Sequence, residues 1–492
     1  MSDDEADPEL LELLRQSLSV STKPKDEISS DTGVLRDAEY IYNNAIDVHI
    51  DMYGTKAAAA NIYQSMQERR YSTHAWTQVE LHPKPSEGFS QLDIVNFVFT
   101  MDLLNFSFWS ELSGVERYQV DYTGKHWTGY NSLLACLRRA IDDGIPITTP
   151  TYWLSGRVSD EALKNVFRSA TAEQIPLIGE RISILREAAD VLHKSFGDLD
   201  EPVEGATEEP TAVPVDLEPV GHVDPSDAKP EVTAQDHPDT EDPENGVTLP
   251  EAAPIHPDHV HVDPVAVPSG ESQSDAHEAE IVRDAAVGEP VTESPRQGEA
   301  DHQASEMSIK EQQAPPRPDY SVVRLIEKAD HSAGKLVNLL VKHFPCFRDE
   351  TRFDRKKVRL FKRAQILVAD LWAAFGGTGY GEFHDIDNVT MFADYRVPQM
   401  LHSLGVLSYS PPLYYRIQSL QPIDSEHSWE VQLRGCSIWA VELIRREILR
   451  NNADAQLNAV LIDFFLYDLA KERERAQEGL AMPHHRTRSM WY

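Results

Sequence analysis

Apolar residues recur at every third or fourth position along much of this chain, and this spacing places them on one face of an α-helix. In Leu133–Asp143 the apolar face is formed by Leu134, Leu137 and Ala140, and Gly144 follows as a helix stop. Further segments with the same spacing are Ile182–Phe196, Val322–Phe344, Val358–Phe375, Ile438–Leu449 and Leu457–Ala470. The sequence therefore predicts a mainly α-helical fold.

Shorter runs of β-branched and aromatic residues predict one or two short β-hairpins within this helical fold. These runs are Tyr118–Tyr122 and Trp429–Leu433. The run Arg352–Arg363 is rich in Lys and Arg, and we interpret it as the solvated beginning of a helix. No internal repeat is visible, so the elements predict one helical domain.

The middle of the chain has a different composition. No Phe, Trp or Tyr occurs between Phe196 and Tyr320, and residues 198–310 contain 29 Asp and Glu against 4 Lys and Arg. Such a segment cannot bury enough apolar surface to offset the entropy lost on ordering. We therefore expect a disordered insertion, which could bind unknown protein partners, inside a single domain. The expected boundaries are an acidic tail over 1–32, a first half over 33–196, the insertion over 197–318 and a second half over 319–492.

Charge and cysteine content exclude several classes of protein. The formal net charge of −35 argues against a stable nucleic-acid partner, because phosphate backbones are bound by clustered Lys and Arg. The beginning of the chain lacks the basic and apolar regions of a secretory signal, and no apolar run is long enough to cross a membrane. Cys136, Cys346 and Cys436 match neither a disulfide framework nor a metal site. These features predict a cytoplasmic protein, with the nucleus as the alternative, and no bound metal.

Aromatic and polar side chains alternate in the run Asn96–Trp109. Five aromatic residues fall in this run, together with polar residues that include Asp102 and Asn105. One interpretation is a buried element with capping polar groups, since each buried polar group needs a hydrogen-bond partner. The other is a slot that stacks a flat heterocycle and reads its edge, with Asn105, Phe108 and Trp109 as its walls.

The helix expected over Leu457–Ala470 carries a carboxylate on its apolar side. At 100° per residue, Asp468 falls within about 40° of the apolar stripe, whereas Asp463 lies about 140° from Asp468. A carboxylate buried in this way is costly unless it is paired or neutral. We expect Asp468 to be either a catalytic carboxylate or the partner of a buried Arg486 or Arg488.

A second acid and several cations complete the candidate chemistry. Asp394 precedes an expected helix with Pro398 in its first turn, so an N-cap role would explain it as well as a functional one. Phe392, two residues earlier, could be simple packing. Lys362 lies close to the apolar side of its helix and could hold a single phosphate. The last residues, 483–492, add His485 and Arg486 beside aromatic side chains.

These motifs together resemble the queuosine salvage protein family. The resemblance implies a fold similar to helix-hairpin-helix DNA glycosylases, without a counterpart for the insertion. It also implies hydrolysis of the N-glycosidic bond of queuosine 5′-monophosphate, which releases queuine for tRNA modification, and no organic cofactor. The matching runs are Asp102–Trp109, Gly144–Thr148, Phe361–Asp370, Met391–Gln399, Arg434–Trp439 and His485–Arg488.

Within this reaction we expect Asp468 to stabilise or capture the sugar cation, because glycosidic cleavage passes through an oxocarbenium-like state. Asp394 would read the base edge with Phe392 stacked on the base. Lys362, with His485 or Arg486, would hold the 5′-phosphate. Asn105, Phe108 and Trp109 would form the walls of the base pocket, and Asp463 is a further expected contact to the substrate. Two other functions stay open, namely a nucleotide- or tRNA-binding module without catalysis and a DNA base-excision glycosylase.

Overall fold

A computed structural model describes residues 28–112, 114–197, 318–476 and 482–492. The expected acidic tail and insertion lie almost wholly outside these residues. None of the described helices is both long and apolar enough to cross a membrane.

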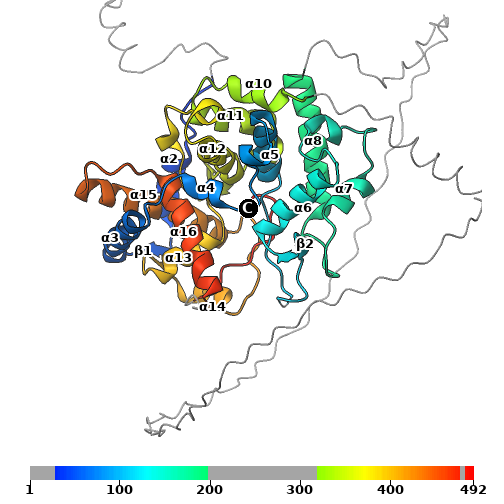
Figure 1. The fold of residues 1–492 in the computed structure, drawn as a ribbon. Coiled ribbons are helices and arrows are strands. Elements are labelled where there is room, and N and C mark those ends of the chain that lie inside the picture. The colour runs from blue at the N-terminus through cyan, green and yellow to red at the C-terminus, as the bar shows by residue number, and fades with distance from the viewer. Residues whose placement is uncertain (1–27, 113, 198–317, 477–481) are drawn as a thin grey trace, which may run out of the picture. The chain divides into compact units, whose positions relative to one another are not determined.

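The described part of the chain is mainly α-helical, as the apolar spacing predicts (Figure 1). The first block contains α2 (Val34–Asn44), α3 (Met52–Arg69), α4 (His74–Gln78), α5 (Gln91–Leu103), α6 (Tyr130–Asp142), α7 (Asp160–Val166) and α8 (Ile178–Phe196). The second block contains α10 (Ser321–Glu327), α11 (Ala333–His343), α12 (Lys362–Ala374), α13 (Arg396–Ser403), α14 (Pro411–Gln418), α15 (Ser428–Asn451) and α16 (Ala459–Arg475).

Short antiparallel strand pairs complete the described fold. Two are local hairpins, β2 (Val120–Tyr122) with β3 (Lys125–Trp127), and β4 (Glu350–Phe353) with β5 (Lys356–Arg359). The third joins the two blocks, because β1 (Val48–Ile50) pairs with β6 (Leu407–Tyr409).

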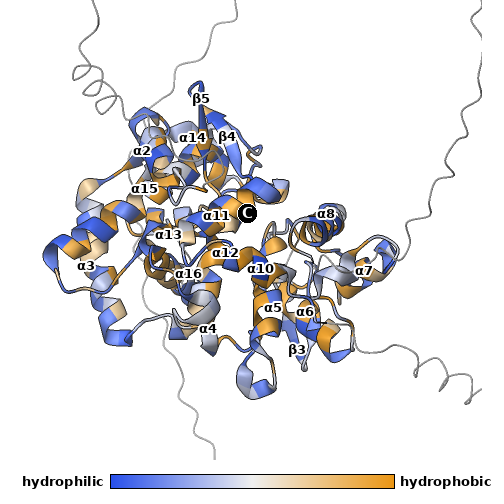
Figure 2. Cartoon of the chain, turned by 90° about the horizontal axis from the view of Figure 1, so that it is seen from above, coloured by the Kyte–Doolittle hydropathy of each residue, from blue (hydrophilic) through white to orange (hydrophobic). Residues whose placement is uncertain are grey.

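The two sequence blocks share one hydrophobic core. Helix α5 of the first block packs on α12 of the second, and α15 packs on α2 and α3 (Figure 1). Where α5, α10 and α12 meet, their ribbons are largely hydrophobic (Figure 2). This packing places the end of α5 beside the beginning of α12, where the candidate site residues lie.

Several predicted elements differ from the observed ones. The expected helix Val322–Phe344 is two helices, because Asp330 and His331 adopt left-handed backbone conformations with φ of 51° and 53°. The predicted β-run Trp429–Leu433 is helical and lies in α15. The basic run interpreted as a helix beginning forms the β4–β5 hairpin, and only its end starts α12.

Candidate active site

Three elements bring charged side chains together beside the end of α5. The beginning of α12 contributes Lys362, the loop before α13 contributes Asp394, and α16 contributes Asp463. Burial lowers the pKa of Lys362, and the electrostatic influence of both carboxylates opposes this shift. We call these three residues the acid–lysine cluster.

Backbone geometry directs Lys362 into the protein. Phe361, the N-cap of α12, has a left-handed backbone with φ of 47°. The Lys362 amide then donates to Asp349 Oδ2 at 3.1 Å, and the side chain is only 5% exposed. Its ammonium donates to the Asn105 carbonyl at 3.4 Å. Burial lowers the pKa of Lys362, and the neighbouring Asp394 and Asp102 partly counteract this shift.

Asp394 caps the first turn of α13 with one oxygen. Its Oδ1 accepts the backbone N–H groups of Arg396 and Val397 at 2.8 and 2.9 Å, so the N-cap interpretation is confirmed. Oδ2 accepts no hydrogen bond from the residues that the structure describes. Burial raises the pKa of Asp394, whereas Lys362 and the two amides lower it. The half-buried carboxylate therefore keeps one oxygen available for another partner.

Asp463 lies on the buried face of α16 and is 5% exposed. Its Oδ1 accepts the backbone N–H of Phe392 at 3.0 Å. Burial, with the charge of Asp394, raises the pKa of Asp463 well above its usual value, against the opposing effect of Lys362. Two carboxyl groups in unequal environments thus act on one ammonium.

The expected phase of α16 is wrong. The fully buried positions of this helix include Val460, Ile462 and Leu466, so Asp463 faces the core and Asp468 is only half-buried. Asp468 Oδ2 accepts the hydroxyl of Tyr71 at 2.6 Å. An ion pair between Asp468 and Arg486 or Arg488 is also wrong for the described structure, in which both arginines lie against Trp109. The catalytic role of Asp468 stays a prediction.

The run Asn96–Trp109 divides between the two interpretations. Its first part lies in α5 and is buried core, while the loop after Leu103 turns toward the cluster. Asn105 donates its Nδ2 to Asp102 Oδ1 at 3.1 Å. Phe108 is half-buried and meets Tyr130 edge-on, with ring centroids 6.3 Å apart. Trp109 is 7% exposed and donates its Nε1 to the Thr487 carbonyl at 2.8 Å.

Phe392 is 2% exposed and packs on Phe464, with ring centroids 6.0 Å apart. Its ring is therefore core, and its backbone N–H, which holds Asp463, is what it contributes to the site. Two half-buried aromatic residues nearby, Tyr395 and Tyr467, were not predicted from the sequence. The charges of Asp394 and Arg396 act on both. Their positions directly after Asp394 and directly before Asp468 were the available signal.

The last described residues are docked against the first block, as Trp491 and Tyr492 would favour. The buried Ser107, whose φ of 54° is left-handed, donates its N–H to the Tyr492 carbonyl at 2.9 Å. His485 is buried, with Nε2 3.2 Å from the Tyr492 hydroxyl. Burial and the nearby His484 and Arg434 lower the pKa of His485 to about 3, so it is neutral near pH 7. A neutral, buried His485 is poorly suited to hold a phosphate.

A buried pair of carboxyl groups lies behind Lys362. Asp102 on α5 and Asp370 on α12 are 0% and 4% exposed, and each acts on the pKa of the other. Asp102 Oδ2 has no donor among the described residues, and a proton shared with Asp370 would satisfy it. Burial raises the pKa of Asp102 to about 7 and that of Asp370 well above its usual value.

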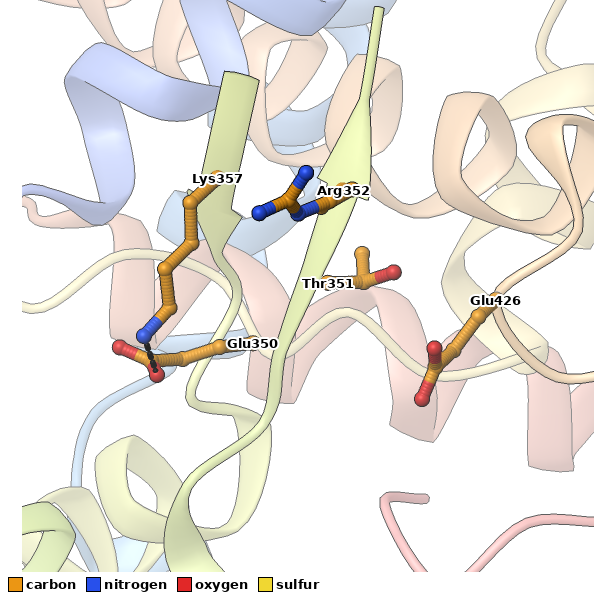
Figure 3. A pocket seen from close by; sticks show the side chains of 5 residues that line it. All are labelled: Glu350, Thr351, Arg352, Lys357 and Glu426. Atoms are coloured by element: carbon orange, nitrogen blue, oxygen red, sulfur yellow. Dashed lines mark ion pairs between the residues drawn. The ribbon is translucent and has the colours of Figure 1, made fainter. Parts of the chain in front are cut away.

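A shallow depression at the β4–β5 hairpin lies elsewhere on the described surface (Figure 3). It contains an ion pair between Lys357 and Glu350, drawn as a dashed line. None of the candidate residues lines it, and its walls are exposed or half-buried side chains that include both charges. Its lining residues are Glu350, Thr351, Arg352, Lys357 and Glu426.

Two carboxyl groups with unequal protonation tendencies, next to aromatic side chains, are the groups that enzymes use to cleave glycosidic bonds. Comparison with known proteins makes this class specific. The family described as "Queuosine salvage protein" matches residues 81–209 and 304–492, so the chain belongs to the queuosine salvage protein family.

Relatives of this chain carry the name queuosine 5′-phosphate N-glycosylase/hydrolase. The protein from Schizosaccharomyces pombe is 32% identical over 473 residues, which cover 93% of this chain and 99% of the relative. The mouse protein is 29% identical, with 92% and 97% covered. The protein from the bacterium Sphaerobacter thermophilus is 28% identical, with 94% and 98% covered. The similarity therefore extends over nearly the full length of both partners.

Proposed function

We propose that this protein hydrolyses the N-glycosidic bond of queuosine 5′-monophosphate and releases queuine for salvage into tRNA modification. The proposal rests on family membership together with one structural observation: the acid–lysine cluster joins two carboxyl groups of unequal environment around a buried ammonium. The products are queuine and ribose 5-phosphate.

The two carboxyl groups are suited to different roles. Burial raises the pKa of Asp394, but Lys362 and the two backbone N–H groups that it accepts oppose this shift, so Asp394 ionises more readily than Asp463. An ionised Asp394 stabilises the positive charge that develops on the sugar as the bond breaks. Asp463 is deeply buried next to Asp394, which favours its protonated form. A protonated Asp463 can donate to the departing base.

The proton balance of the reaction closes within the cluster. The base is a 7-deazapurine without N7, so the proton from Asp463 goes to another atom of the base as the bond to C1′ breaks. Water then forms the new bond to C1′ and returns a proton to the Asp463 carboxylate. Lys362 keeps the cluster near neutrality without forming a direct ion pair with the carboxylates of the described residues, so Asp394 stays available to the sugar.

A substrate comparison tests the proposal. The full-length protein is incubated separately with queuosine 5′-monophosphate, the dephosphorylated nucleoside and queuosine-containing tRNA, and free queuine is measured by chromatography. We expect release from the monophosphate with one ribose 5-phosphate per queuine. We also expect the Asp394→Asn variant, which can still accept the two capping hydrogen bonds, to lose about 10²- to 10³-fold in rate. Absence of release from the monophosphate would contradict the proposed function, and binding of the intact tRNA without release would favour a binding module.

A further inference from the structure

Two arginines lie against one aromatic ring near the candidate active site. The guanidinium carbon of Arg488 lies 3.6 Å from the ring centroid of Trp109, and that of Arg486 lies 5.7 Å from it. Neither arginine forms an ion pair with a carboxylate in the described part of the chain. Both side chains are half-buried, so they remain accessible to a ligand.

Backbone contacts hold these arginines in place without using their charge. The Arg486 carbonyl accepts the Ile423 amide at 2.8 Å, and the next carbonyl, of Thr487, accepts Trp109 Nε1 at 2.8 Å. Arg488 donates only Nη1, to the Ser107 hydroxyl at 3.2 Å and the Trp109 carbonyl at 2.8 Å. Its Nε and Nη2 donate to no acceptor in the part of the chain that the structure describes, and such a planar pair of donors can bind a phosphate with two hydrogen bonds.

The other cations near the site already lie close to carboxylates of the described residues. Arg396 and Lys471 both pair with Glu474, at 3.2 and 3.0 Å. The ammonium of Lys362 faces three carboxylates, those of Asp394, Asp102 and Asp463. A phosphate dianion next to Lys362 would lie close to these carboxylates and be repelled by them. Arg486 and Arg488, by contrast, form no ion pair with the described residues, although the charges of Glu111 and Glu173 act on Arg488.

Neighbouring residues connect the arginine pair to Asp394. Tyr395, the residue after Asp394, acts electrostatically on Arg488, and its ring lies 4.6 Å from that of His484. Arg486 in turn acts on His484. This chain of neighbours joins the arginines to the acid–lysine cluster, as a nucleotide with its sugar at Asp394 and its phosphate at the arginines requires.

We propose that Arg486 and Arg488, which both contact Trp109, form the binding site for the 5′-phosphate of the substrate, and that Lys362 serves the carboxylates instead. The inference rests on the proposed function for the identity of the nucleotide. Its chemical content, a phosphomonoester site made by two unpaired arginines, can be tested separately.

The first test measures binding and needs no catalysis. Ribose 5-phosphate and ribose are titrated by calorimetry into the full-length wild type and into Arg486→Gln, Arg488→Gln, Lys362→Met and the exposed control Arg450→Gln. We expect wild type and the control to bind ribose 5-phosphate more tightly than ribose, and each Arg variant at the site to weaken its binding about 10- to 100-fold. Equal binding by wild type and both Arg variants, or no binding by wild type, would overturn the inference.

The second test uses the ratio of kcat/KM for the monophosphate to that for the nucleoside. A general structural defect lowers both values and leaves their ratio unchanged. We expect the ratio to fall about 10- to 100-fold in Arg488→Gln, to recover partly in Arg488→Lys, and to stay unchanged in Lys362→Met, whose two values fall together. If the ratio of the two kcat/KM values falls only in Lys362→Met, the phosphate binds at Lys362 and the inference is wrong. If ribose 5-phosphate binds through the arginines but no queuine is released, the proposed function fails and the phosphate site stands.

Discussion

Two groups of buried charges lie next to each other and differ in how completely they are paired. In the first, which we call the Arg434 cluster, Arg434 bonds to Asp349 and to Glu430. The second is the acid–lysine cluster of Lys362, Asp394 and Asp463. Asp349 contacts both, because its Oδ2 also accepts the Lys362 amide.

The Arg434 cluster leaves little of its charge or hydrogen-bonding capacity unused. Its guanidinium bonds to both oxygens of Asp349, to Glu430 and, through Nε, to the Ala393 carbonyl at 2.9 Å. The ring of Tyr492 lies 4.4 Å from it. The neighbouring carboxylates raise the pKa of Arg434 despite its burial. Such a group is suited to fixing α15, the loop before α13 and the last residues of the chain relative to one another.

The acid–lysine cluster has the opposite character. Lys362 meets only a carbonyl oxygen at 3.4 Å, and Asp394 keeps one oxygen free among the described residues. The pKa values of both carboxyl groups are raised by burial. Incomplete pairing of buried charges lowers the stability of the fold. Unpaired charges are nevertheless found in sites where a ligand or a transition state supplies the missing partner. The comparison therefore separates charges that stabilise the fold from charges that are available to bind a substrate.

The largest expected effect is on stability, in the Arg434 cluster. Arg434→Met leaves Asp349 and Glu430 buried without their cation, so we expect the free energy of unfolding in urea to fall by about 3–5 kcal/mol. The control is Arg450→Met, which removes an exposed pair with Glu447 on the same helix and should cost less than about 1 kcal/mol. Similar losses in the two variants would show that the Arg434 cluster contributes no more than a surface pair.

The next effect is on catalysis, in the acid–lysine cluster. We expect Asp463→Asn to lower kcat for queuine release by about 10²-fold or more, because the proton donor is lost, while the urea midpoint stays level or rises. Asp468→Asn, one turn further along α16, should change kcat by less than about 10-fold, because Asp468 is held by Tyr71. The sequence-based assignment of Asp468 requires the reverse order, so the pair of variants decides between the two carboxylates.

The sequence was sufficient for much of the fold. The helix expected over Leu133–Asp143 is observed at Tyr130–Asp142, because its apolar face and glycine stop are strong local signals. The β4–β5 hairpin was missed because its turn, Asp354 and Arg355 with φ of 42° and 66°, lacks the glycine that usually marks such a turn. Trp429–Leu433 was misassigned because β-propensity is weak against the tertiary packing of α15 on α2 and α3.

The candidate site was predictable in its residues and less so in their arrangement. Lys362, Asp394 and Asp463 were all identified, and the structure brings them together. The phase of α16 was not predictable, because apolar residues occur all around this helix and only its contacts with α13 and α15 decide which side is buried. The unpaired state of Arg488 depends on Trp109, a residue far away in sequence, and local patterns carry no such information.

The smallest expected effect concerns Asp102 and Asp370, which form a third group of buried charges. Their titration tests whether incompletely paired charges lower the free energy of unfolding when no substrate is bound. Burial holds the pKa of Asp102 near 7, above the value of about 3.9 for an unfolded chain. The folded state therefore binds more protons than the unfolded state between these values. Stability is full below about pH 4 and is lost as the pH rises toward about 7, and the nearby Lys362 and Arg363 reduce this loss.

Asp102→Asn removes one of the two ionising groups and can still donate a hydrogen bond to Asp370. We expect urea unfolding at pH 5, 6, 7 and 8 to show a decline in stability that is smaller than that of wild type by roughly 1–2 kcal/mol. The exposed Asp190→Asn should follow wild type at every pH. Parallel curves for wild type and Asp102→Asn would mean that the pair is already ionised at pH 5, compensated by Lys362 and Arg363. Asp102 would then belong with the fully paired charges of the Arg434 cluster, and incomplete pairing would be confined to Lys362, Asp394 and Asp463.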